Sequence, residues 1–370
     1  MTDKTRPIGL YIHIPFCRSK CPYCDFYSFS PREELIDEYT KRVCEELKNT
    51  HHTFDTVYFG GGTPSFIGEK RITEILGKVA FTNNAEITVE CNPSDTGDKE
   101  RSFDFSALAQ AGVNRISMGL QSSSESERRA LGRRAGKDEV LRAVERAQNA
   151  GIDNISLDLM LGIPGQTAES LKGSVDFAVS ADARHISAYI LKIEENTFFG
   201  RHPEKYSFPS DDETADLYLK TAEALKEKGY IHYEISNFAV PGYESRHNLK
   251  YWKLDDYLGT GPAAHSFIGG KRSFYPADIK EYLSGCDRIS DGEGGGEDEY
   301  IMLSLRLREG LDLGKYEERY SKTVNPGFTE KCRLYADRGF GSFDGRIFSL
   351  NSRGFLISNT VISELLAELD

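Results

Sequence analysis

Three cysteines near the amino terminus have a spacing that suits metal chemistry. Cys17, Cys21 and Cys24 form a C-x3-C-x2-C run directly after an apolar, strand-like segment, residues 11–16. Cysteine thiolates bind iron–sulfur clusters, and a four-iron cluster usually takes four of them. This run offers three, and Phe26, which follows it, is not a ligand. The run therefore predicts a cluster with one iron free to bind a small molecule, as an open metal position does in a catalytic site.

The sequence gives less support to two other uses of these cysteines. A zinc site needs a fourth partner, commonly from a second close pair of ligands. The other cysteines are scattered, at Cys44, Cys91, Cys286 and Cys332. A disulfide framework is not expected from an odd total of seven cysteines in a chain where we expect no secretory signal. Free thiols instead predict a reducing compartment, the cytoplasm.

The cysteine run and its flanks resemble a known family. The stretch YIHIPFC…CPYCDF, with the aromatic Tyr23 before the third cysteine, is similar to the radical S-adenosylmethionine (radical SAM) enzymes. Within them it looks like the branch that contains oxygen-independent coproporphyrinogen III oxidase and the heme chaperones. The resemblance implies a [4Fe–4S] cluster on Cys17, Cys21 and Cys24, whose open iron binds SAM. One electron, expected from a flavodoxin or ferredoxin, would cleave SAM to methionine and a 5′-deoxyadenosyl radical.

Alternating segments predict the fold that positions the cysteines. The strand candidates are 10–14, 56–59, 87–91, 114–118, 155–159 and 185–190. The helix candidates between them are 33–48, 69–79, 103–111, 137–150 and 168–181. This alternation favours parallel β/α units. We expect an α/β protein with a partial (β/α)6 TIM-like barrel, which the resemblance also implies, and chemistry at the carboxyl ends of its strands.

The second half of the chain predicts smaller pieces around this barrel. The expected elements are a helix at 211–228 capped by Ser210, a strand at 230–237, a loop-rich stretch at 238–276, a linker at 291–299, a helix at 300–308, a hairpin around Asp344–Gly345 and a last helix at 359–369. The predicted domains are a barrel core (1–237), a loop-rich extension (238–290) and a C-terminal α+β module resembling a winged helix (291–370).

A glycine-rich motif follows the second predicted strand. FGGGTPS (59–65) precedes a helix, and its glycines would let the backbone approach a ligand and leave amide groups free to bind it. The alternative is a tight turn without a ligand. By resemblance, the residues at the methionine end of SAM and beside the cluster are Gly61, Gly62, Thr63, Tyr11 and Tyr23.

Polar residues at other strand ends complete the expected SAM site. Glu90 ends a strand and could accept hydrogen bonds from a ribose, although a solvated carboxylate is the default. Gln121 follows the fourth strand, and Arg133 could pair with the SAM carboxylate. Asp158 lies in an apolar strand, where an unpaired carboxylate is costly. The resemblance assigns Glu90 to the ribose, Arg133 to the carboxylate and Asp158 to the adenosine end.

The motif HNLKYW (247–252) suggests contact with heme. His247 could ligate iron through a neutral imidazole, and Tyr251 and Trp252 could flank a porphyrin. A lone histidine in a loop is more often structural, but the motif matches the H-N-x-x-Y-W of the heme-chaperone branch. His265 is a second candidate for heme contact.

Charge and hydropathy exclude two classes of partner. The net charge is −12, whereas nucleic-acid binding needs clustered Lys and Arg, so no nucleic-acid partner is expected. No apolar run reaches about 18 residues, so we expect no stable membrane insertion.

Three features favour the heme-chaperone branch over the oxidases. The oxidases extend their motif to C-x3-C-x2-C-x-C, and Phe26 occupies the extra position here. The motif lies close to the start of the chain, which leaves no room for the N-terminal extension of the oxidases, and HNLKYW is present. We therefore expect a protein that binds heme and passes it to a partner protein. Decarboxylation of coproporphyrinogen III to protoporphyrinogen IX is the alternative, and radical SAM chemistry on another substrate is a third.

Overall fold

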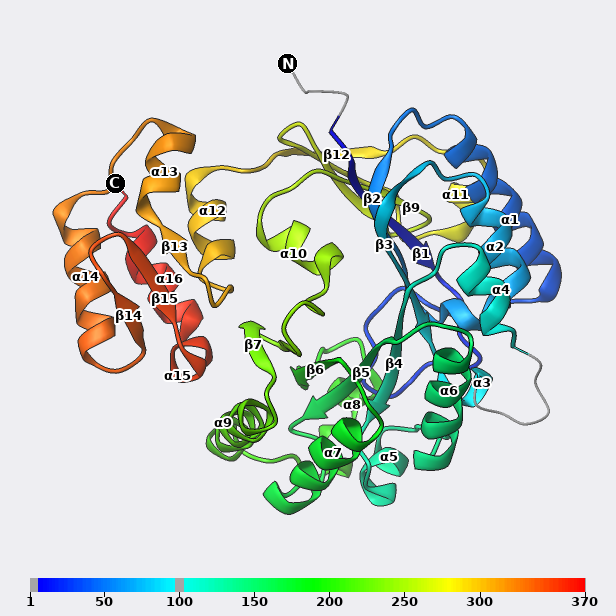
Figure 1. The fold of residues 1–370 in the computed structure, drawn as a ribbon, viewed down its shortest axis with the longest axis horizontal. Helices are drawn as coiled ribbons and strands as arrows, with labels where there is room; N and C mark the ends of the chain where they lie inside the picture. Colours follow the sequence, from blue (N-terminus) through cyan, green and yellow to red (C-terminus); the bar gives the residue numbers. More distant parts are fainter. Residues whose placement is uncertain (1–5, 97–102, 370) are drawn as a thin grey trace.

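A parallel sheet with helices on its outer side forms most of the molecule (Figure 1). The structure, a computed structural model, describes residues 6–96 and 103–369. Six neighbouring strands run parallel and in chain order. They are β1 (Ile8–Ile14), β2 (Phe54–Gly61), β3 (Phe81–Cys91), β4 (Arg115–Gln121), β5 (Asn154–Leu161) and β6 (His185–Ile190). The predicted TIM-like β/α core is confirmed.

Helices connect these strands as the helical periodicity predicts. The main ones are α1 (Glu33–Lys48), α2 (Glu69–Leu76), α4 (Phe105–Gln110), α6 (Lys137–Asn149) and α7 (Ala168–Ser180). Short pieces lie beside them at the strand ends: η1 (Pro64–Ile67), α3 (Pro93–Thr96) and α5 (Glu125–Ala130). Along these strands, apolar side chains such as Leu10, Ile12 and Val57 are fully buried in the core with the helices. They alternate with polar ones such as Thr56, Tyr58 and Glu90, because successive side chains of a strand point to opposite faces.

Short strands extend the sheet at both edges and correct three predictions. The stretch predicted to be loop-rich contains α10 (Arg246–Trp252), β9 (Tyr257–Thr260), β10 (His265–Ile268) and β11 (Lys271–Phe274). Strand β12 (Ile289–Glu293) extends into the predicted linker at 291–299. The predicted strand at 230–237 is a hairpin of β7 (Ile231–Glu234) and β8 (Asn237–Ala239). These strands form by pairing with distant partners, since β9 lies parallel to β1 and β8 antiparallel to β6.

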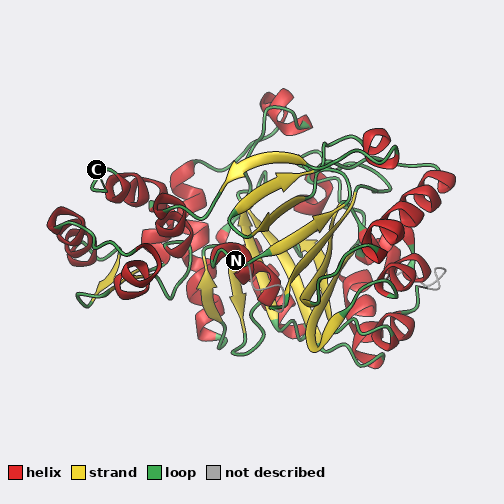
Figure 2. Ribbon diagram, turned by 90° about the horizontal axis from the view of Figure 1, so that it is seen from above, coloured by secondary structure: helices red, strands yellow, loops and turns green. Residues whose placement is uncertain are grey.

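The C-terminal part forms a separate small layer to one side of the barrel (Figure 2). Its elements are α12 (Glu297–Ser304), β13 (Leu311–Asp312), α13 (Leu313–Tyr320), α14 (Pro326–Asp337), β14 (Gly341–Phe343), β15 (Ile347–Leu350), α15 (Ser352–Leu356) and α16 (Ser358–Leu366). The predicted hairpin around Asp344 is confirmed as β14–β15, in a sheet of order β13-β15-β14. The winged-helix likeness and the three domain boundaries stay predictions.

Three further helices precede this module along the chain. They are α8 (Phe198–Arg201), α9 (Asp211–Glu227) and α11 (Ile279–Leu283). The side chain of Ser210 accepts the backbone N–H of Glu213, which confirms the predicted cap of α9. No helix within residues 6–96 and 103–369 has the length and apolar character needed to cross a membrane.

Candidate functional site

The cysteine run forms a loop at the carboxyl end of β1. The backbone N–H of Cys17 donates to the carbonyl of Phe29 at 2.9 Å, and the N–H of Phe29 donates to Pro15 at 3.0 Å. The backbone N–H of Cys24 donates to the carbonyl of Cys21 at 3.1 Å, which closes a turn between the two residues. All three thiols are free and half-buried. A folded backbone therefore holds the three side chains at one strand end.

The surroundings of these thiols suit an iron–sulfur cluster. The Sγ of Cys17 lies 3.3 Å from the hydroxyl of Thr63, and the guanidinium of Arg133 lies 4.0 Å from the Sγ of Cys21. Burial raises the pKa of the Cys17 and Cys24 thiols, so metal must displace their protons. Within the described residues, no three Cys, His or acidic side chains converge on one ion. The ligands of a cluster bind separate irons and need no such convergence, unlike ligands of zinc.

The glycine-rich motif holds the cysteine loop. The N–H groups of Gly62 and Thr63 donate to the carbonyls of Ile14 and Phe16, at 2.7 and 2.8 Å. The prediction of free amides is therefore wrong at these two positions, because both N–H groups already donate to backbone carbonyls of the protein. A Cβ added to Gly62 would lie 2.7 Å from both carbonyl oxygens. Glycine is needed here to let the backbone that follows β2 approach the loop that carries Cys17.

Two carboxylates lie at the centre of the sheet's carboxyl edge. Glu90 accepts a hydrogen bond from the hydroxyl of Tyr58 at 2.8 Å and another from the N–H of Gly61. Burial raises the pKa of Glu90 to about 7, and the neighbouring Asp158 contributes to the rise. Burial likewise raises the pKa of Asp158 to about 6. Carboxyl groups kept partly protonated near neutral pH mark a candidate binding site.

Gln121 carries an unsatisfied polar atom into this site. It ends β4 at a register shift, with a backbone φ of 65°, and only 8% of its surface is exposed. Its Oε1 has no hydrogen-bond partner among the described residues. Leaving a buried acceptor unpaired costs about 1–3 kcal/mol, which a polar ligand would offset. The site therefore fits the polar cofactor that the resemblance implies.

Arg133 and its neighbour Arg134 differ in exposure. Arg133 is half-buried and donates to the carbonyl of Gly119 at 2.6 Å, whereas Arg134 is exposed. The guanidinium of Arg133 is thus fixed between β4 and Cys21, where it can meet an anionic group beside the cluster.

The two predicted tyrosines flank the cysteine loop from different sides. The hydroxyl of Tyr11 lies 3.1 Å from Nδ1 of His13, and its ring stacks on Tyr58 with centroids 6.2 Å apart. Tyr23 packs against Phe199 at 6.4 Å. Burial raises the pKa of both phenols, so both stay neutral hydrogen-bonding groups.

His247 is buried in α10. Its Nδ1 lies 2.8 Å from the hydroxyl of Thr56, its Nε2 lies 2.7 Å from the hydroxyl of Tyr251, and its backbone N–H donates to Glu86. Only 1% of its surface is exposed, and burial lowers its pKa to about 3. The imidazole is neutral, but neither ring nitrogen is open to a heme iron in this arrangement.

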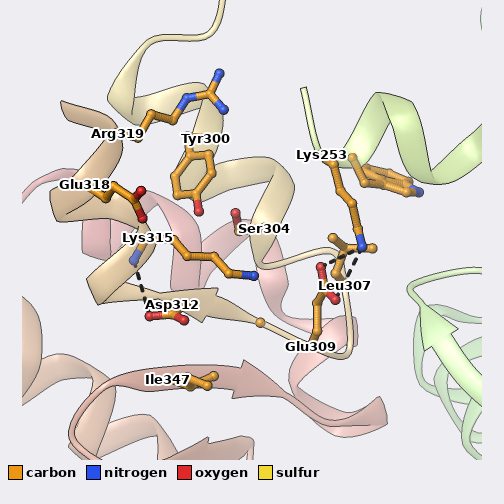
Figure 3. A pocket seen from close by; sticks show the side chains of 12 residues that line it. Lys253, Tyr300, Ser304, Leu307, Glu309, Asp312, Lys315, Glu318, Arg319 and Ile347 are labelled. Carbon is orange, nitrogen blue, oxygen red and sulfur yellow. Dashed lines mark hydrogen bonds and ion pairs between the residues drawn. The ribbon is translucent and has the colours of Figure 1, made fainter. Parts of the chain in front are cut away.

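Tyr251 and Trp252 face two different cavities. Tyr251 lines a cavity of about 390 Å³ beside the cysteine loop, together with Tyr11, Phe26 and His265. Trp252 lines a cavity of about 580 Å³ between α10 and the C-terminal module. Figure 3 shows the second cavity, with Tyr300, Ser304 and Lys315 around it and Lys253 paired with Glu309. The expectation that both aromatic residues flank one porphyrin is wrong, because neighbouring residues of a helix point in different directions.

Three residues of the site were given no binding role in the sequence analysis. His13, Tyr58 and Phe26 lie among the predicted residues, the first two on β1 and β2. The available signal was a polar aromatic residue inside an apolar strand. For Phe26 the signal was its place after the third cysteine, and 68% of its surface is exposed.

Family models match both parts of the chain. The Radical SAM superfamily matches residues 11–178, and the HemN C-terminal domain matches residues 298–357. A three-cysteine loop on a TIM-like β/α core defines a radical SAM protein, and the family implies a four-iron cluster and SAM as cofactors.

Full-length relatives give the family within this class. Heme chaperone HemW of Escherichia coli is 39% identical, over 99% of this chain and 100% of the relative. The same protein of Bacillus subtilis is 33% identical, over 97% and 99%. The chain belongs to the HemW family. Among solved structures, coproporphyrinogen III oxidase (HemN) from Escherichia coli superimposes with a TM-score of 0.82 at 22% identity, covering 98% of this chain and 90% of that one. This likeness bears on the fold alone.

Proposed function

We propose that this protein is a heme chaperone, which binds heme and transfers it to a partner protein, on a radical SAM core. The observation that carries the proposal is an aromatic cavity beside the cysteine loop, in a chain whose full-length relatives are named heme chaperones. The cavity of about 390 Å³ falls in the range of about 300–1,000 Å³ that small-molecule sites occupy.

Side chains already described would hold the cofactors. Cys17, Cys21 and Cys24 would ligate the cluster, which supplies one electron to bound SAM. Arg133 would bind the SAM carboxylate and Gln121 would use its unpaired Oε1. Further contacts to SAM are proposed for Tyr11, Tyr23, Gly61, Gly62, Thr63, Glu90 and Asp158. The amides of Gly62 and Thr63 are occupied, so these two residues would contribute shape rather than N–H donors.

The proposed function also implies partner proteins and a cellular location. A heme-receiving protein would accept the cargo, and a flavodoxin or ferredoxin would reduce the cluster. We propose a cytoplasmic location, because seven free cysteines and an air-sensitive cluster both suit a reducing compartment.

One pair of assays separates this function from its alternative. The cluster-loaded protein is titrated anaerobically with hemin and followed by its Soret absorbance. In parallel, coproporphyrinogen III, SAM and a reductant are supplied and protoporphyrinogen is assayed. We expect saturable heme binding and no decarboxylation, because Phe26 occupies the position of the oxidases' extra cysteine. Turnover to protoporphyrinogen would instead establish the oxidase activity.

A further inference from the structure

One histidine of the chain differs from the others in its surroundings. The sequence contains eight. Four of these histidines have both ring nitrogens in hydrogen bonds to the protein: His13, His185, His232 and His247. The pair His51–His52 precedes β2, at the opposite end of the strands from the cysteine loop, and His202 lies 3.7 Å from Glu204. His265 remains.

His265 is exposed at the edge of the aromatic cavity. It begins β10, and its ring stacks on Phe274 with centroids 5.2 Å apart and planes 24° apart. No hydrogen bond to its ring is present among the described residues, and it lines the cavity together with Phe26 and Tyr251. The stacking fixes one face of the imidazole while its edge stays open, as a metal ligand requires.

The walls of this cavity suit a flat aromatic molecule. Tyr11, Tyr27, Tyr251 and Tyr257 line it, and the ring of Phe26 stands largely in solvent at its rim. A flat ligand lying against this ring would remove its apolar surface from water, which is favourable. Lys20, whose ammonium donates to the carbonyl of Phe26 at 2.9 Å, places a cation beside this rim. Heme combines an iron, an apolar ring and anionic propionates, and matches all three features.

We propose that heme binds in this cavity with His265 as an axial ligand of its iron and Phe26 against the porphyrin face. The inference rests on the proposed function and names its site. A neutral imidazole is a common axial ligand of heme iron. The site lies next to Cys24, so heme bound there would cover the side of the cysteine loop that carries Asp25 and Phe26.

The HNLKYW motif then acts through Tyr251. The imidazole of His247 holds the hydroxyl of Tyr251 at 2.7 Å, and Tyr251 packs edge-on against Tyr257 at 4.6 Å. His247 is thus a positioning residue that fixes one wall of the cavity, while the iron is ligated by His265.

Hemin titration of the full-length, cluster-loaded protein tests the assignment. Loss of an outer-shell partner alone costs about 10–100-fold in metal affinity, so His265→Ala should weaken hemin binding by at least about tenfold. In the reduced complex of the wild type, resonance Raman spectroscopy should show an iron–histidine stretching band. His265→Ala should lose this band, and added imidazole should restore an iron–imidazole band by filling the vacated position. His265→Gln, which keeps a polar side chain of similar length, should behave in the same way.

Matched variants give the controls. His202→Ala removes another partly exposed histidine and should leave hemin affinity and the iron–histidine band unchanged. His247→Asn should weaken binding and keep the iron–histidine band, because it alters a wall and not the ligand. Phe26→Ala should also weaken binding and keep this band.

The possible outcomes distinguish an error in the proposed heme site from an error in the proposed heme-chaperone function. If wild-type protein does not bind hemin, the proposed function itself fails. If it binds, and both His265 variants keep its affinity and the iron–histidine band, the function stands and the proposed site is wrong. Loss of this band in His247→Asn but not in His265→Ala would identify His247 as the iron ligand and overturn the assignment.

Discussion

Replacing Gly62 by alanine should detach the cysteine loop from the sheet. The added Cβ would lie 2.7 Å from the carbonyl oxygens of Ile14 and Phe16, which are backbone atoms and cannot rotate away. Overpacking of this kind costs about 1–3 kcal/mol, and the hydrogen bonds from Gly62 and Thr63 are each worth about 0.5–1.5 kcal/mol. If both bonds break, the free energy of unfolding should fall by about 2–6 kcal/mol.

Two measurements follow the loop and the whole fold separately. Urea unfolding of the cluster-free protein gives the change in free energy, and anaerobic reconstitution gives the iron bound per chain. Gly77→Ala is the matched control, since an added Cβ there meets its nearest heavy atom at 3.4 Å and the backbone φ is −63°. We expect Gly62→Ala to lose stability and iron together. A Gly62→Ala protein as stable as the control, with a full complement of iron, would refute the role of the glycine motif in holding the cysteines.

The other predictions concern one thiol and one carboxyl. Cys21→Ala should abolish the broad brown absorbance of the reconstituted cluster, and retention of four irons would mean that the ligands are misassigned. The pKa of Glu90 is raised from 4.5 to about 7, so the folded state holds a proton that the unfolded state releases, and stability is lost as the pH rises between these values. Wild-type cluster-free protein should therefore lose up to about 3 kcal/mol of stability relative to Glu90→Gln between about pH 4.5 and about pH 7, measured by urea unfolding. A stability difference independent of pH would contradict the buried, protonated carboxyl.

Local signals in the sequence determined the barrel and the cysteine loop. The helices from 33 to 48 and from 168 onward begin where predicted because their periodicity and neighbouring residues act over a few positions. The C-x3-C-x2-C run, Glu90, Gln121 and Arg133 could be placed together because parallel strands bring their carboxyl ends to one edge.

The tertiary structure determined which polar groups of these residues are open to a ligand and which are already hydrogen-bonded. Whether the amide of Gly62 is open or occupied depends on the carbonyl of Ile14, which lies 48 positions earlier in the chain but 2.7 Å away. The ring of His247 is closed off by Thr56, 191 positions away, while the exposed His265 is covered on one ring face by Phe274 of the neighbouring strand. The edge strands themselves escaped prediction for the same reason. A motif fixes the type of a side chain, but burial and hydrogen bonding come from distant segments that only the folded chain brings together.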